Sequence, residues 1–319
     1  ADIGVRGEGE LTFVSLLQAL EESAGDPRGA AMAVPGLVVR QGGSLVDTGS
    51  APPPADLDLL ASPLAMGLFD LGRYSEIVML LSARGCPHAC TFCQWGGSNI
   101  PYRRHGLEYV ASELKALARA GVRKIAFGDG TFNASTARLR GLRDVLAREG
   151  LAFTIYDADC RADIFDEEQA LLLKELGVVD VGFGLESVNA RTLGLIKKAL
   201  DPRQVRRAVL AARPHIPSIH VSMIVGLPGE TRQDIMATAD FLGELPLDYV
   251  GVNALRLQEG TNLSALDPAL TPPPLPPEEC QDVIEQLRRR FKIMNPHEQH
   301  LQMRRDLALL VANPGPCPA

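Results

Sequence analysis

Short apolar runs alternate with longer amphipathic stretches from residue 77 to residue 292. The short runs have the length of buried strands, and the stretches between them repeat their apolar positions at helical spacing, as at Val110, Leu114 and Leu117. The predicted strands are 77–81, 124–127, 152–156, 180–184, 219–225 and 249–255, and the predicted helices are 108–120, 135–148, 166–176, 202–212, 232–245 and 277–292. Strands and helices that alternate in this way are typical of parallel β/α units, so we predict an α/β fold.

The flanking segments have a different pattern. Residues 1–76 hold too little apolar surface for a core of their own, with one short helix predicted over 11–20 and a hairpin over 34–46 around two glycines. A Pro-rich linker follows from Pro52. The predicted organisation is therefore an N-terminal α+β arm and linker at 1–76, an α/β core at 77–267, and a C-terminal helix with a Pro-rich tail at 268–319.

Composition narrows the class of protein. The chain has 319 residues, 46% of them hydrophobic, and a net charge of −7. An acidic balance argues against nucleic-acid binding, which usually needs a basic surface. The sequence contains no run of about 18 apolar residues and no signal segment at its start, so we expect no membrane span. Six cysteines, three of them close together, fit the reducing cytoplasm better than a disulfide framework.

The three close cysteines are Cys86, Cys90 and Cys93, directly after the first predicted strand. Each iron of a 4Fe–4S cluster normally takes one thiolate, so three thiolates would leave the fourth iron open. An open iron can chelate an amine and a carboxylate, and S-adenosylmethionine carries both. A structural zinc site is the alternative, but zinc usually draws on four ligands, and no second cysteine pair follows at the required spacing.

Further motifs follow the later predicted strands. Gly128-Asp129-Gly130 follows the second strand, Glu186-Ser187 the fourth, and Gly-Leu-Pro-Gly-Glu-Thr at 226–231 the fifth. In barrels of parallel strands, functional residues gather at these carboxyl ends. Together with the cysteine loop, the motifs resemble the radical S-adenosylmethionine superfamily, and in particular its cobalamin-binding subgroup.

The resemblance covers nearly the whole chain and implies roles for individual residues. Cys86, Cys90 and Cys93 would be the catalytic cysteines that hold the cluster, with Phe92 as the aromatic residue before the third cysteine. The implied S-adenosylmethionine contacts are Gly128, Asp129 and Gly130 to the amino group, Glu186 and Ser187 to polar groups, Lys198 to the carboxylate, Ser222 to the ribose, and Gly226 and Glu230 at the adenine. Two departures from the family pattern weaken single assignments: Gly-Asp-Gly is a variant motif, and Glu259 stands where a proline is usual.

The family also implies a fold and a reaction. The fold is a partial (β/α)6 barrel, since a full eight-fold barrel needs about 250 residues, more than the core supplies. The implied reaction is reductive cleavage of S-adenosylmethionine to a 5′-deoxyadenosyl radical, which abstracts hydrogen from a small-molecule substrate. A reductant such as flavodoxin or ferredoxin would supply the electron.

The N-terminal segment has a resemblance of its own. Residues 5–10, Val-Arg-Gly-Glu-Gly-Glu, followed by a short helix, resemble the tail of a cobalamin-binding domain that would lie mostly upstream. Cobalamin is therefore a third implied cofactor, and methyl transfer to an unactivated carbon is the leading hypothesis. Two alternatives stay open: a related radical oxidoreductase or cyclase that transfers no methyl group, and a non-catalytic metal-binding scaffold.

Overall fold

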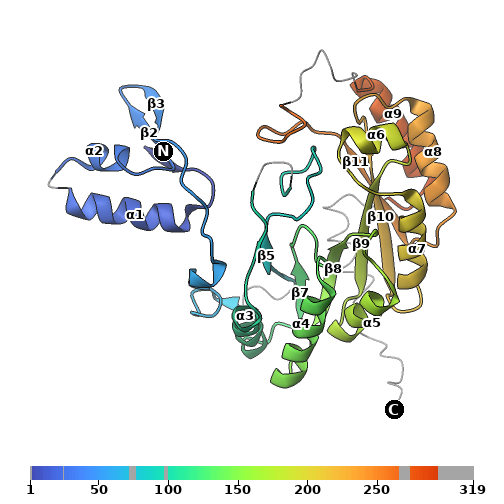
Figure 1. Ribbon diagram of the computed structural model, residues 1–319, viewed down its shortest axis with the longest axis horizontal. Helices are drawn as coiled ribbons and strands as arrows, with labels where there is room; N and C mark the ends of the chain where they lie inside the picture. Colours follow the sequence, from blue (N-terminus) through green and yellow to red (C-terminus); the bar gives the residue numbers. More distant parts are fainter. Residues whose placement is uncertain (1, 24, 72–76, 97–99, 266–273, 294–319) are drawn as a thin grey trace. The chain divides into compact units, whose positions relative to one another are not determined.

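The computed structural model describes residues 2–23, 25–71, 77–96, 100–265 and 274–293. The chain divides into two compact units (Figure 1), one of residues 1–62 with 103–105 and the other of residues 63–102 with 106–319. The predicted Pro-rich tail after residue 293 lies outside the described residues.

The larger unit is built on a six-stranded sheet whose neighbouring strands are all parallel. The strands are β4 (Val78–Leu80), β7 (Lys124–Phe127), β8 (Thr154–Cys160), β9 (Asp180–Glu186), β10 (Ser218–Val225) and β11 (Tyr249–Ala254). Their order across the sheet is their order along the chain. Each crossover therefore returns to the adjacent strand, as in a (β/α) barrel, and the sheet is the predicted partial barrel.

Helices lie along the outer side of the sheet (Figure 1); all but the last, α9, connect successive strands, and α9 follows β11. They are α3 (Leu107–Arg119), α4 (Thr136–Glu149), α5 (Glu167–Leu176), α6 (Ala190–Leu195), α7 (Pro202–Ala212), α8 (Arg232–Gly243) and α9 (Pro277–Arg290). The short strand β5 (Ala83–Arg84) precedes the cysteine loop. Apolar side chains such as Leu117, Leu173 and Val209 are fully buried between helices and sheet. The prediction missed only α6 among these helices, because six residues are too few for a helical period to stand out.

Two strands extend further than predicted. β8 begins at Thr154 and continues to Cys160, so Asp157 and Asp159 lie inside the strand and not in the loop after it. The predicted end at residue 156 was wrong because aspartate is rare in strands, whereas here Asp157 and Asp159 line a cavity that the strand borders. β9 likewise continues to Glu186, two residues beyond its predicted end.

The smaller unit holds an antiparallel sheet of β1 (Ile3–Val5), β2 (Leu37–Gln41) and β3 (Ser44–Asp47), with α1 (Gly9–Glu22), α2 (Pro27–Met32), the 3₁₀ helix η1 (Leu57–Leu59) and β6 (Arg103–Arg104). The predicted hairpin is confirmed: Gly42 and Gly43 both have positive φ between β2 and β3. α1 buries Leu16 and leaves Val14 and Leu17 half exposed, because its small core accepts one narrow face of the helix.

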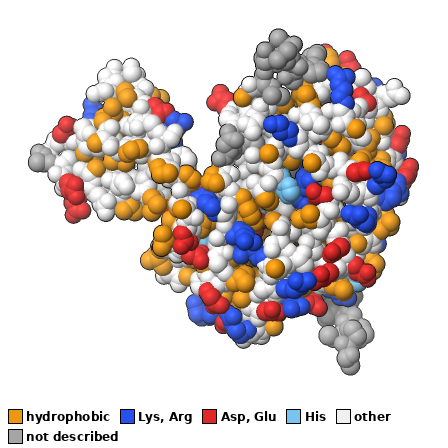
Figure 2. Space-filling model, in the orientation of Figure 1, with side chains coloured by type: hydrophobic (Ala, Val, Ile, Leu, Met, Phe, Trp, Pro, Cys, Tyr) orange, Lys and Arg blue, Asp and Glu red, His pale blue; other side chains and the backbone are white. Residues whose placement is uncertain are grey.

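The surface of the larger unit carries both signs of charge. Acidic and basic side chains intermingle over the visible face (Figure 2), and several form ion pairs between helices, such as Arg140 with Glu168 and Arg206 with Glu244. None of the helices in the described ranges combines the length and the apolar character needed to cross a membrane.

Candidate active site

The three loop cysteines line one cavity of about 950 Å³ in the larger unit. Cys90 is buried, and Cys86 and Cys93 are half buried. All five cysteines in the described part of the chain are free thiols. Phe92 also lines the cavity and packs against the apolar cluster of Leu193, Ile196, Ile224 and Leu227, which holds the loop against the ends of β9 and β10.

Asp129 anchors the chain that leads into the cysteine loop. Its carboxylate accepts hydrogen bonds from the Ser82 amide at 2.7 Å, the Ser82 hydroxyl at 2.5 Å and the Ala83 amide at 3.1 Å. Burial raises the pKa of Asp129, and these donors act in the opposite direction. The guanidinium of Arg138 donates to the Ser82 carbonyl at 3.1 Å, so both sides of this segment are fixed. Asp129 therefore positions the cysteine loop and also lines the cavity.

The loop packs too closely for side chains at two glycines. A Cβ at Gly96 would lie 1.9 Å from the His88 carbonyl oxygen, because the loop folds back on itself there. A Cβ at Gly130 would lie 3.3 Å from the Cys86 Cβ and 3.2 Å from the Trp95 Cβ. The Cys86 thiol also donates a hydrogen bond to the Gly130 carbonyl oxygen, with 3.7 Å between Sγ and O. The glycine of the second motif thus leaves room for the cysteine loop, a role that sequence reasoning missed.

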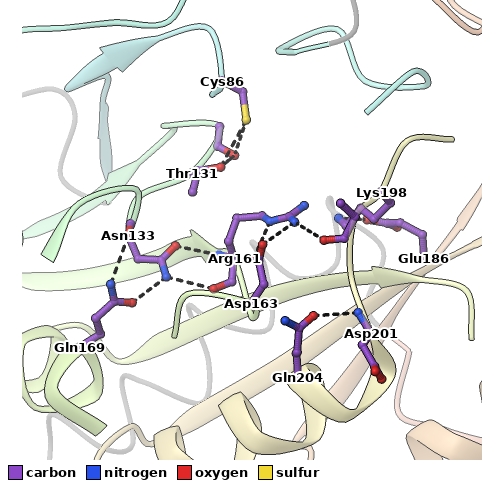
Figure 3. Close-up of polar contacts among 12 residues, drawn as sticks. Cys86, Thr131, Asn133, Arg161, Asp163, Gln169, Glu186, Lys198, Asp201 and Gln204 are labelled. Atoms are coloured by element: carbon purple, nitrogen blue, oxygen red, sulfur yellow. Dashed lines mark hydrogen bonds and ion pairs between the residues drawn. The ribbon is translucent and has the colours of Figure 1, made fainter. Parts of the chain in front are cut away.

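Across the cavity, Lys198 and Glu186 form a buried ion pair with 2.9 Å between Nζ and Oε1 (Figure 3). Burial disfavours the ammonium, but the carboxylate of Glu186 and the Cys90 thiol outweigh it and raise the pKa of Lys198. Both side chains line the cavity. The ammonium has further N–H donors and the carboxylate a second oxygen, so the pair can hold a zwitterionic ligand.

Arg161 connects the cavity wall to the segment that carries Lys198. Its guanidinium donates two hydrogen bonds to Asp163, each at 2.9 Å, and one to the Ala199 carbonyl at 3.0 Å (Figure 3). The Arg161 backbone is also fixed, because its N–H donates to the side-chain oxygen of Asn133 at 2.7 Å. Arg161 lines the cavity, yet its polar contacts are structural.

The donor set at the loop fits an iron–sulfur cluster. Among the described residues, Asp157, Asp159 and His220 are the group whose ligand atoms lie within 4.8 Å of one another, and the loop thiols form no such group. One zinc ion with Zn–S bonds of about 2.3 Å needs its thiolates closer than that. Three separated thiolates suit a cluster, where each binds a different iron. Burial raises the pKa of the Cys90 thiol, while the charges of Lys198 and Arg161 favour its thiolate.

The cavity gathers most of the predicted site residues. Those that line it are Cys86, Cys90, Phe92, Cys93, Gly128, Asp129, Gly130, Glu186, Lys198 and Ser222. Ser187, Gly226 and Glu230 are outside that lining. Ser187 donates to Glu230 at 2.6 Å, and both are buried between the turn after β9 and the turn after β10. Gly226 has a φ of +90° and packs beside Cys280. Their roles in cofactor binding stay predictions.

The prediction missed a polar group deeper in the barrel. Asp157 and Asp159 of β8 line the cavity, and His220 of β10 lies beside them. The available signal was the spacing of two residues between the aspartates, which puts both on one face of a strand. The strand boundary predicted at residue 156 concealed it.

Comparisons with known proteins agree with this geometry. The family model described as "Radical SAM superfamily" matches residues 80–242, just over half of the chain. A protein of Pyrococcus horikoshii named as an uncharacterized methyltransferase is 32% identical over 271 residues, which cover 82% of this chain and 57% of the relative. The anaerobic magnesium-protoporphyrin IX monomethyl ester cyclase of Synechocystis is 29% identical over 221 residues, covering 67% of this chain and 43% of that protein.

Among solved structures, the radical S-adenosylmethionine methyltransferase TsrM of Kitasatospora setae shares the fold. Its TM-score is 0.66 at 22% identity, covering 82% of this chain and 53% of TsrM. The chain spans about half the length of the curated relatives it matches. With the family model matched over the β/α core, and with the three cysteines and the Lys198–Glu186 pair lining one cavity, this chain belongs to the radical SAM superfamily.

Proposed function

We propose that this chain carries the catalytic core of a cobalamin-dependent radical methyltransferase that acts on a small molecule. The observation that carries the proposal is the shared cavity: three thiols enter it from one loop, and the buried Lys198–Glu186 pair borders it from β9 and the segment after α6. This arrangement suits two ligands side by side, one bound by sulfur and one by charge.

The chemistry of each side chain indicates its role in binding the cluster or S-adenosylmethionine. Cys86, Cys90 and Cys93 would hold the cluster, Lys198 would bind the carboxylate of S-adenosylmethionine as a point charge, and Glu186 would accept from its hydroxyl or amino groups. When bound, the cluster and S-adenosylmethionine together supply a radical able to take hydrogen from an unactivated carbon. Phe92 and Phe127 give part of the cavity wall an apolar surface, which would help to shield that radical from water.

Methyl transfer is supported by the methyltransferase-named relative of P. horikoshii. A second candidate is radical oxidation or ring closure without methyl transfer, which the similarity to the Synechocystis cyclase favours. For either reaction we propose a one-electron reductant such as flavodoxin or ferredoxin and a cytoplasmic location, in keeping with a described chain that has no membrane-crossing helix.

The test follows products of S-adenosylmethionine. The protein is purified without oxygen, reconstituted with iron and sulfide, reduced with dithionite, and incubated with S-adenosylmethionine, with and without cobalamin. We expect 5′-deoxyadenosine from the wild type, none from Cys90→Ala, and wild-type amounts from Cys280→Ala, which removes a cysteine outside the loop. Formation of S-adenosylhomocysteine and methylcobalamin would support methyl transfer, and their absence beside 5′-deoxyadenosine would favour the second candidate. Stoichiometric zinc without iron would refute both.

A further inference from the structure

A polar group of three side chains lies at the cavity, with Asp157 and Asp159 in its lining and His220 beside them. One ligand atom from each of Asp157, Asp159 and His220 lies within 4.8 Å of the others. Two of the residues come from β8 and one from β10, so the strands of the barrel themselves bring them together. The two aspartates border the same cavity as the cysteine loop, so one ligand can reach both regions.

Asp180 and Tyr249 hold the imidazole of His220 in place. Its Nδ1 lies 3.1 Å from Asp180 Oδ2, and the Tyr249 hydroxyl donates to the same carboxylate oxygen at 2.7 Å. The ring of Tyr249 stacks on the imidazole with 4.6 Å between centroids. His220 is 5% exposed and Asp180 1%. The imidazole is therefore oriented with its second nitrogen toward the aspartate pair.

The group of Asp157, Asp159 and His220 can accept a hydrogen bond from a further donor. Asp157 Oδ1 is buried, with no hydrogen-bond partner among the described residues, and Asp157 has a left-handed backbone with φ of 70°. The charged groups that act on Asp157 are the carboxylates of Asp159 and Asp180 and the imidazole of His220. Burial and the neighbouring Asp159 raise the pKa of Asp157 to about 7, which is the expected response of a carboxylate with too little positive charge nearby.

Two glycines of β9 let the polar side chains pack directly against the strand. A Cβ at Gly182 would lie 2.4 Å from His220 Nε2 and 2.9 Å from Asp159 Oδ1. A Cβ at Gly184 would lie 2.6 Å from Lys198 Nζ. Gly182 and Gly184 are two residues apart and therefore lie on the same face of β9. The polar group and the Lys198–Glu186 pair therefore both pack directly against the same face of β9.

We propose that Asp157 and Asp159, backed by His220, bind a cationic nitrogen of the substrate, a primary ammonium or a guanidinium. Such a group supplies several N–H donors and the missing positive charge at once. That this cation belongs to the substrate of the radical reaction rests on the proposed function. A divalent metal is the other occupant that this group could take, and it needs a deprotonated imidazole nitrogen, whereas the neighbouring carboxylates raise the pKa of His220 to about 9.

Binding of the cation depends on pH. The charged and titratable groups that act on the aspartate pair are Cys160, Asp180, Glu186, Lys198 and His220, and Tyr249 donates to Asp180 behind them. As pH rises through about 7, Asp157 loses its proton and the site becomes more negative, while an alkylammonium keeps its charge. The affinity for ammonium is therefore expected to rise between pH 6 and 8.

The test uses butylammonium as the probe and 1-butanol as its neutral counterpart. Both are titrated by ligand-observed NMR against the full chain reconstituted with iron, sulfide and S-adenosylmethionine. We expect saturable butylammonium binding that strengthens from pH 6 to 8, and binding of 1-butanol about tenfold weaker or more. Asp159→Asn should weaken butylammonium about tenfold and leave 1-butanol unchanged. Asp144→Asn, the same charge change on the exposed surface of α4, should alter neither.

Three outcomes would overturn the proposal: equal binding of the two probes, butylammonium binding that is indifferent to pH in the wild type, or Mn²⁺ bound tightly and stoichiometrically in competition with butylammonium. The pH series needs no variant, so it holds even where Asp159→Asn fails to fold. The same preparations are assayed for 5′-deoxyadenosine. Its absence beside intact butylammonium binding would refute the proposed radical function alone, and its formation without butylammonium binding would refute the cation site alone.

Discussion

The Nζ of Lys198 lies 2.9 Å from the Oε1 of Glu186, and each side chain is 8% exposed. The pair exists because Gly184, two residues before Glu186, has no side chain: a Cβ there would lie 2.5 Å from Oε1 and 2.6 Å from Nζ. Glu186 itself has a left-handed backbone with φ of 69°, which turns its carboxylate toward the lysine. Buried pairs of this kind lose more when one partner is displaced than an exposed pair does.

Gly184→Ala is therefore expected to displace the pair and to weaken S-adenosylmethionine binding by about tenfold or more. The affinity is measured by equilibrium dialysis on reconstituted protein, and thermal unfolding shows whether the variant is folded. Gly194→Ala is the matched control, because a Cβ at Gly194 meets no atom within 4 Å. Equal affinities of the two variants for S-adenosylmethionine would contradict the role given to the pair.

Asp129→Asn is expected to lower the free energy of unfolding by about 2 kcal/mol, because an amide cannot accept the three hydrogen bonds from Ser82 and Ala83 that the carboxylate accepts. Denaturant unfolding measures the loss, and hydrogen exchange of the Ser82 and Ala83 amides should become faster. Asp144→Asn on the surface of α4 serves as the control and should change the stability little. Unchanged exchange at both amides would show that Asp129 does not anchor the loop.

Glu230 makes stability depend on pH. Burial raises its pKa from 4.5 to about 7, although Ser187 donates to it. The folded protein therefore holds a proton that the unfolded chain releases, and this contribution is complete below pH 4.5 and lost as pH rises through 7. The wild type should lose about 2–3 kcal/mol more than Glu230→Gln between pH 4.5 and 8.

Denaturant unfolding of both proteins across that pH range checks the sign. Glu244→Gln, at an exposed carboxylate on the end of α8, should follow the wild type. A difference between wild type and Glu230→Gln that stays constant with pH would mean that Glu230 ionises normally in the folded state.

Asp180 controls the charge of His220. Burial disfavours the imidazolium, but the Asp180 carboxylate outweighs it and raises the pKa of His220 to about 9. In Asp180→Asn, that pKa should fall from about 9 toward its ordinary value of 6.5, because burial then meets only the opposition of Asp157 and Asp159. Imidazole NMR signals measured against pH report the change. Tyr249→Phe removes only the hydroxyl contact to Asp180 and should leave the pKa of His220 well above 6.5. An unshifted His220 in Asp180→Asn would refute the assignment.

Much of the architecture is readable from the chain alone. The alternation of apolar runs and amphipathic stretches predicts the six parallel strands and nearly all of the helices that follow them, because burial on the two faces of a sheet and on one face of a helix imposes different periods. The spacing of Cys86, Cys90 and Cys93 predicts metal chemistry before any fold is known, since a local loop sets the distances between these thiols.

Contacts between distant parts of the chain were decided by the tertiary structure. The ion pair of Lys198 with Glu186, the anchoring of Ser82 by Asp129 and the meeting of Asp157 with His220 each join residues from different strands or loops. Sequence periodicity reports which face a residue occupies, and carries no information on which residue of another strand lies opposite. That choice depends on strand register and on the absence of side chains at Gly182 and Gly184, which lets these groups pack against β9, and both are set only once the sheet has formed.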